Sequence, residues 1–100
     1  MKTDEQRKAI DAFRKHHGIT LEQLGQYMRK IHSDQALSRQ HVDQMLKNNG
    51  TTKFETYKDQ FAPAFNAIFK ERGFEVNLTL CDIFRMVENR QKKEVMQVNV

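Results

Sequence analysis

The fold is decided by residues 18–57, GITLEQLGQYMRKIHSDQALSRQHVDQMLKNNGTTKFETY. This stretch contains two amphipathic helix patterns, each preceded by a residue that can cap a helix N-terminus. Thr20 begins the first pattern and Ser38 the second. The polar residues 32–35 between them are typical of a turn. The stretch therefore predicts two helices joined by a turn.

The second helix pattern has separate apolar and polar faces. Its apolar residues recur at the i, i+3, i+4 spacing of a buried stripe: Val42, Met45 and Leu46. At about 100° per residue, the opposite face carries Gln40, Gln44 and Lys47, flanked by His41 and Asp43. Glutamine can form two hydrogen bonds with the N6 and N7 edge of adenine, and lysine can reach a guanine edge or a phosphate. The pattern predicts a helix for the major groove of DNA, and the alternative is a solvated face rich in glutamine.

Length, composition and charge limit the class of protein. One hundred residues form one domain with a single core. No apolar run is long enough to cross a bilayer and the charged N-terminus lacks a signal-peptide region, so we expect a cytoplasmic, nucleoid-associated protein. Residues 1–53 hold ten Lys or Arg against six Asp or Glu, whereas residues 54–100 hold seven of each. This excess would attract phosphate groups to the helix pair.

Capping signals mark the helix boundaries. Three pairs have the spacing of a capping box: Thr3 with Gln6, Thr20 with Gln23, and Thr52 with Glu55. Three glycines stand just past the ends of helix patterns: Gly18, Gly50 and Gly73. With the apolar periodicity, these signals predict four helices, over residues 4–17, 20–32, 38–48 and 52–72. Pro63 should break the last one, as a kink or as the start of a fifth helix.

The same periodicity predicts which side chains are buried. We expect Arg7 on the outer face of the first helix and Ile31 on the inner face of the second. The fourth pattern should form an aromatic core from Phe54, Tyr57, Phe61, Phe65, Ile68 and Phe69. The single cysteine, Cys81, has apolar neighbours and should be a buried thiol.

The last quarter of the chain changes pattern. Apolar residues alternate with polar ones in two places, at Phe74, Val76 and Leu78 and at Met96, Val98 and Val100, which predicts two short strands. Thr79 with Asp82 can open a helix between them. The sequence thus predicts a mainly α protein. We expect a helix-turn-helix bundle of four to five helices over residues 1–73 and a strand/helix/strand extension over 74–100, which packs on the bundle or mediates dimerisation.

Residues 19–57 resemble the lambda-repressor-like (Cro-type) helix-turn-helix domain. In that motif a threonine follows a hydrophobic position and a small residue comes later, as in residues 19–25 here, and residues 37–46 match the recognition helix. The resemblance implies base contacts by Arg39, Gln40 and Gln44. It implies phosphate contacts by Ser38, Lys47, Asn48, Asn49, Thr51 and Lys53.

Two features depart from the family pattern. Leu21 stands where a phosphate-binding glutamine is common, and about seven extra residues separate Gly25 from Leu37. Because seven residues are nearly two helical turns, a lengthened second helix would keep its buried face in phase. Additional contacts with DNA or with another protein would then come from Arg29, Lys30, His32 and His41.

These patterns predict a sequence-specific transcriptional regulator that binds double-stranded DNA, a repressor acting as a homodimer. The alternative is a small helical module that binds another protein, such as an inhibitor with a surface rich in methionine and phenylalanine. An enzyme is disfavoured because the chain has no glycine-rich phosphate loop, no paired carboxylates in an apolar setting and no nucleophile beside an evident base. The four histidines lack the spacing of a zinc site, so we expect neither a metal nor a cofactor.

Overall fold

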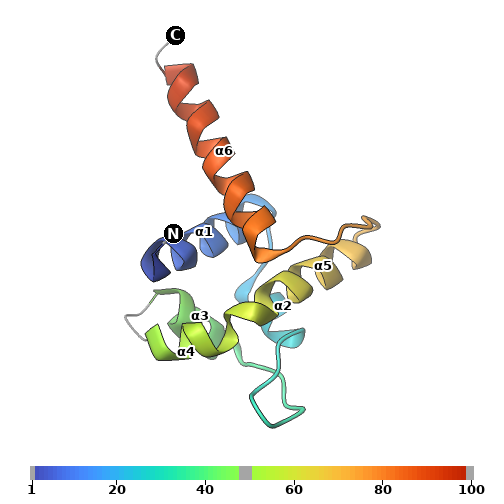
Figure 1. The fold of residues 1–100 in the computed structure, drawn as a ribbon. Helices are drawn as coiled ribbons and strands as arrows, with labels where there is room; N and C mark the ends of the chain where they lie inside the picture. The colour runs from blue at the N-terminus through green and yellow to red at the C-terminus, as the bar shows by residue number, and fades with distance from the viewer. Residues whose placement is uncertain (1, 48–50, 99–100) are drawn as a thin grey trace.

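The computed structural model describes residues 2–47 and 51–98, and the side chains of these residues except 51–53 and 91–98. The described residues form six α-helices and one 3-10 helix (Figure 1): α1 (Thr3–His16), α2 (Leu21–Gln26), α3 (Arg39–Lys47), α4 (Thr51–Tyr57), η1 (Lys58–Gln60), α5 (Phe61–Glu71) and α6 (Leu80–Val98). They contain no strand, and their one extended pairing is an isolated bridge between Arg29 and Ala36. The prediction of a mainly helical chain is confirmed.

Local capping explains where α2 and α3 begin. The Thr20 side chain accepts from the Gln23 N–H at 3.0 Å, and the Gln23 side chain accepts from the Thr20 N–H at 2.8 Å, which is the predicted capping box of α2. The Ser38 hydroxyl accepts from the His41 N–H at 3.2 Å and so caps α3. These bonds satisfy amide donors that a helix N-terminus leaves free.

Two other capping predictions have different outcomes. At α1 the box is wrong, because Lys2 precedes the helix without a side-chain cap and the Thr3 hydroxyl donates instead to Glu55 in α4, at 2.9 Å. At α4, the side chain of Thr52 lies outside the described residues. All of Gly50 lies outside them as well. The φ angles of Gly18 and Gly73, 63° and 91°, confirm that both adopt the left-handed conformation expected after a helix.

The core lies among α1 to α5 and the start of α6. Its largest fully buried side chains are Ile10, Ile19, Leu24, Met28, Val42, Met45, Phe54, Phe61, Phe65, Ile68 and Ile83. Phe13 of α1 meets Phe65 and Phe69 of α5 edge to face, with ring centroids 5.0 and 6.0 Å apart. The predicted aromatic core of residues 54–69 is therefore confirmed.

The break in the fourth predicted helix is confirmed. α4 ends at Tyr57, η1 follows, and α5 begins at Phe61, so Pro63 is the third residue of a new helix. Proline is tolerated in a first helical turn because its missing N–H would have no partner within the helix.

Two predictions of burial are wrong in α1 and α6. Arg7 is only 5% exposed and pairs with Asp4. It is buried because α3, α4 and α6 all pack against α1, so that only a narrow strip of α1 faces solvent. Cys81 is exposed. It lies about 200° around α6 from the buried Ile83, on the side turned away from the bundle.

The predicted strand/helix/strand extension is also wrong. Residues 74–79 have no regular secondary structure, and α6 runs to Val98 through the second predicted strand, of which Val100 lies outside the described residues. The start of α6 packs on α1 and α5, and the helix then projects from the bundle (Figure 1). None of the helices in the described ranges combines the length and the apolar character needed to span a membrane.

Candidate nucleic-acid interface

The two helices of the predicted DNA-binding unit are held together at Gly25. A β-carbon built there would lie 2.4 Å from the backbone oxygen of Leu37, which is closer than real contacts allow. The Leu37 N–H lies 3.1 Å from the Gly25 oxygen and 3.3 Å from the Met28 oxygen. Glycine is therefore required here because the chain that leads into α3 crosses directly over α2.

The connection between these helices differs from the sequence prediction. The second helix was predicted over residues 20–32, but α2 ends at Gln26. The guanidinium of Arg29 donates to the backbone oxygen of Gln26, the last residue of α2, and so satisfies a carbonyl that the helix end leaves free; it also donates to the Met28 oxygen. A lengthened second helix is consequently wrong, and Ile31, predicted to be buried, is 43% exposed.

The extra residues instead form a short hairpin, residues 29–36, visible as the cyan-green loop that projects below the bundle in Figure 1. Its ends are the bridged pair Arg29 and Ala36. Because the Leu37 N–H lies against the Met28 oxygen, the chain enters and leaves the hairpin at nearly the same point. The hairpin is thus an insertion into an otherwise short turn between α2 and α3.

The outer face of α3 brings two of the predicted base-contacting residues together, Gln40 and Gln44, beside Lys47. Arg39 and Ser38 are also exposed, at the start of the helix, but Arg39 lies about 140° around α3 from Gln44. The face opposite Gln40 and Gln44 is buried. The Lys47 ammonium lies 3.0 Å from the Asp43 carboxylate one turn earlier. An exposed ion pair of this kind contributes at most about 1 kcal/mol, so Lys47 can turn to another anion at small cost.

Other predicted contact residues are placed differently. Lys30 is exposed on the hairpin, but the Arg29 guanidinium is engaged with the end of α2. His41 is half-buried, with its ring 5.4 Å from the Tyr57 ring. The remaining predicted phosphate ligands cannot be placed: Asn48 and Asn49 lie outside the described residues, and so do the side chains of Thr51 and Lys53.

Two residues that support the hairpin were not found by sequence reasoning. The Gln60 side chain accepts from the Arg29 N–H at 2.7 Å and donates to the Arg29 oxygen at 3.0 Å. The Tyr57 hydroxyl accepts from the Ile31 N–H at 3.3 Å. Tyr57 was assigned to the core, where it also lies, and Gln60 was given no role. Contacts across such sequence separations leave no local pattern in the chain.

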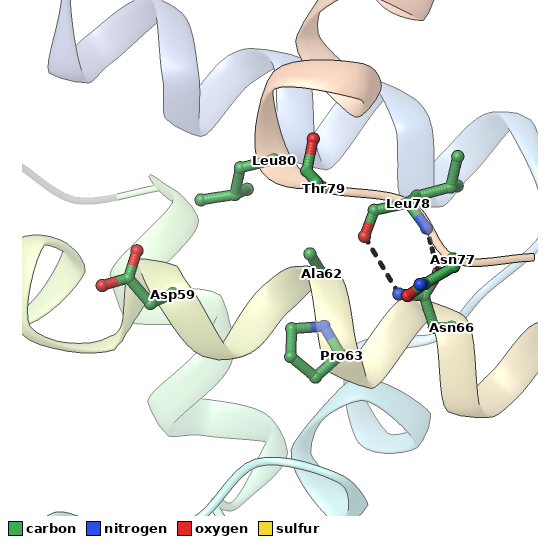
Figure 2. Close-up of a pocket in the computed structure, with 8 residues that line it drawn as sticks. All are labelled: Asp59, Ala62, Pro63, Asn66, Asn77, Leu78, Thr79 and Leu80. Atoms are coloured by element: carbon green, nitrogen blue, oxygen red, sulfur yellow. Dashed lines mark hydrogen bonds between the residues drawn. The ribbon is translucent and has the colours of Figure 1, made fainter.

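A groove of about 540 Å³ lies between the start of α5 and residues 77–80 (Figure 2). The Asn66 amide crosses it, donating to the Leu78 oxygen at 3.0 Å and accepting from the Leu78 N–H at 2.9 Å. At its edge, Thr79 and Asp82 form the capping box of α6. These hydrogen bonds fix Leu78 against α5 and cap the start of α6, so we assign the groove a structural role.

The side chains in the described part of the chain form no cluster of three or more His, Cys, Asp or Glu residues that could hold a metal. Comparison with known proteins finds no matching family model, no similar curated protein and no similar solved structure. The similarity of residues 19–57 to the lambda-repressor-like domain therefore stays a prediction from the sequence.

Proposed function

We propose that the protein is a sequence-specific DNA-binding transcriptional regulator, a repressor whose α3 enters the major groove. One observation carries the proposal: α3 packs against α2 and presents Gln40, Gln44 and Lys47 outward together, with Arg39 exposed in its first turn. Base recognition needs hydrogen-bonding side chains on a rigid helix narrow enough for the groove. α3 meets these requirements, because Val42, Met45 and Leu46 anchor its inner face.

The contacts divide into two kinds. Gln40 and Gln44 lie one turn apart and supply amides that can pair with adenine, and Arg39 supplies a guanidinium that can pair with guanine. Ser38 and Lys47 stand at opposite ends of this face, where they can reach phosphates on either side of the groove. The proposal extends the phosphate contacts to residues 48, 49, 51 and 53, as the family resemblance implies.

We propose further that the protein acts as a homodimer whose two copies of α3 enter successive major grooves, about 34 Å apart. The support is a group of exposed apolar side chains within residues 74–86: Phe74, Val76 and Met86 are 60%, 41% and 44% exposed. The other exposed large apolar side chain among the described residues, Ile31, lies on the hairpin. This arrangement leaves the polar face of α3 for DNA and an apolar surface for a second copy.

The proposal is tested by selecting bound duplexes from a random-sequence library at two salt concentrations. We expect enrichment of a two-fold-symmetric motif and a steep fall of affinity with salt. Gln44→Ala should then cost about 1 to 3 kcal/mol of binding free energy at one base position, whereas Lys47→Ala should weaken all duplexes and flatten the salt dependence. Gln26→Ala and Lys70→Ala are matched controls, because both side chains are exposed and belong to other helices, α2 and α5.

Two results would contradict the proposal. Equal losses of Gln44→Ala on selected and random duplexes would show that this residue does not contact a base. The absence of any enriched duplex would remove the DNA-binding proposal. A protein-binding module would then be the better candidate, because the exposed Phe74, Val76 and Met86 are side chains typical of a protein interface.

A further inference from the structure

We propose that the hairpin, residues 29–36, grips the DNA phosphate backbone beside the groove that α3 enters. This inference rests on the proposed function, and it assigns to the inserted hairpin a contact that relatives of the resembled family make at the start of their second helix. Four steps carry it: what the start of α2 lacks, how the hairpin is built, where it is anchored and what charge it presents.

The start of α2 offers no cationic side chain to a phosphate. Leu21 is buried, although the matching family position commonly carries a phosphate-binding glutamine. In the capping box the side-chain oxygens of Thr20 and Gln23 accept from each other's backbone N–H, so only their neutral hydroxyl and amide hydrogens are left as donors. Glu22 is exposed and acidic, so it repels a phosphate. A cationic contact on that side therefore has to come from another element.

The hairpin is a built element. Beyond the Arg29 and Ala36 bridge, the Lys30 N–H donates to the Gln35 oxygen at 2.9 Å. The Ser33 N–H donates to the Lys30 oxygen at 3.1 Å and closes a tight turn, in which His32 has a φ of 61°. A non-glycine residue in this left-handed conformation costs free energy, and the surrounding hydrogen bonds hold it there.

The anchor of the hairpin places it alongside α3. The Tyr57 hydroxyl accepts from the Ile31 N–H, and the Tyr57 ring packs on the His41 ring of α3. His41 lies about 60° around α3 from Gln44, on the flank of the outer face. Gln60 clamps Arg29 on the same side. The hairpin projects from the bundle at the end opposite α6 (Figure 1), which leaves it open to a ligand that lies across α3.

The hairpin presents cations and donors of the kind that phosphates accept. Lys30 is exposed, and so is Arg29 at the base of the hairpin, where only its Nη1 donates to the Gln26 and Met28 oxygens. His32 and Ser33 are exposed at the tip, against a single acidic residue, Asp34. Contacts of this kind position a protein on the duplex and strengthen binding to every sequence equally.

Two variants test this inference. In the first, Lys30 to Gln35 are replaced by Asn-Gly, which gives a two-residue turn and keeps the Arg29 and Ala36 pair and both Gln60 bonds. The second combines Lys30→Ala with His32→Asn, because asparagine tolerates the left-handed conformation. Since the second changes only exposed side chains, it decides the question if the first fails to fold, as judged by circular dichroism. Lys70→Ala is the matched control.

Binding is measured by fluorescence anisotropy over a range of salt, on the selected duplex and on a random duplex. Loss of affinity by the same factor on both duplexes, with the salt slope reduced by about one for each subunit, supports the hairpin contact. Wild-type affinity and slope in the double variant overturn it. If Lys47→Ala and Gln44→Ala still weaken binding in that case, the proposed function stands and only the role of the hairpin falls. If the unaltered protein binds no duplex, both proposals fall.

Discussion

The α2–α3 pair and residues 74–79 both lie against α5, but they are held in different ways. In the helix pair, Leu24, Val42 and Met45 are completely buried, and Gly25 lies against the backbone that leads into α3. In residues 74–79, which we call the strap, Phe74 and Val76 stay exposed. The strap is fixed by the Asn66 amide on Leu78 and by the Phe74 N–H, which donates to the Phe69 oxygen at 2.9 Å.

This difference separates two kinds of surface. The helix pair is rigid and polar on its outside, as hydrogen bonding to base edges requires, since a small displacement would misplace each donor. The strap is apolar on its outside and held at few points, so it can adjust to a partner protein. The proposed DNA contact and the proposed dimer contact therefore fall on parts of the molecule that differ in stiffness as well as in chemistry.

The largest effect on the contrast between the helix pair and the strap is expected from Gly25→Ala, which disturbs the packing of the helix pair. Alanine normally favours a helix over glycine by about 1 kcal/mol, but here its β-carbon would meet the Leu37 backbone. We expect the free energy of unfolding, measured by urea denaturation, to fall by about 1 to 3 kcal/mol, and DNA affinity to fall with it. Gln26→Ala in the same helix should change stability by less than about 0.5 kcal/mol. Unchanged stability of Gly25→Ala would show that α2 and α3 do not pack as described.

Most of the helix pair could be predicted because its signals are local. The capping box at Thr20, the cap at Ser38 and the apolar stripe of α3 each depend on residues within one or two turns of one another. The exposed face of α3 followed from the same periodicity. These residues would be arranged in this way by nearly any tertiary structure that retains the helices.

The hairpin and the strap could not be predicted, because distant partners decide them. The hairpin depends on Tyr57 and Gln60, which bind Ile31 and Arg29 across 26 and 31 residues of sequence. The alternation at Phe74 and Val76 indicates a strand only when another strand lies alongside, and none does in the described residues. Arg7 was misplaced for a related reason, since three helices pack around α1.

A smaller effect on stability is expected from Asn66→Ala, which loosens the strap and leaves the helix pair intact. It removes both hydrogen bonds to the Leu78 backbone, which should lower the free energy of unfolding by about 1 to 2 kcal/mol. Hydrogen exchange should accelerate at amides of the strap and the start of α6, while the amides of α2 and α3 keep their protection. The exposed neighbour Asn77→Ala is the control. Equal acceleration in both regions would mean that the strap and the helix pair unfold as one unit.

The smallest effect is expected at the corner between α1 and α5, from which the strap departs. The His17 ring lies 4.5 Å from the Phe13 ring and 5.1 Å from the Phe69 ring, measured between centroids. Its backbone oxygen accepts from the Arg72 guanidinium at 2.6 Å, which ties the two helix ends together. Burial, followed by the nearby positive charges of His16, Arg72 and Arg90, lowers the pKa of His17 below its ordinary value of 6.5.

Acid should therefore loosen this corner. Because the unfolded chain binds a proton at His17 more readily than the folded protein does, the stabilisation is complete above about pH 6.5 and is lost as the pH falls through the lower pKa of the folded state. In His17→Leu, the free energy of unfolding should decline less between about pH 7.5 and pH 5.5 than in the unaltered protein. The difference should be small, since the ring is only partly buried and solvent screens its charge. An identical pH dependence in His17→Leu and the unaltered protein would place the acid sensitivity elsewhere. It would also show that acid does not loosen the corner between α1 and α5.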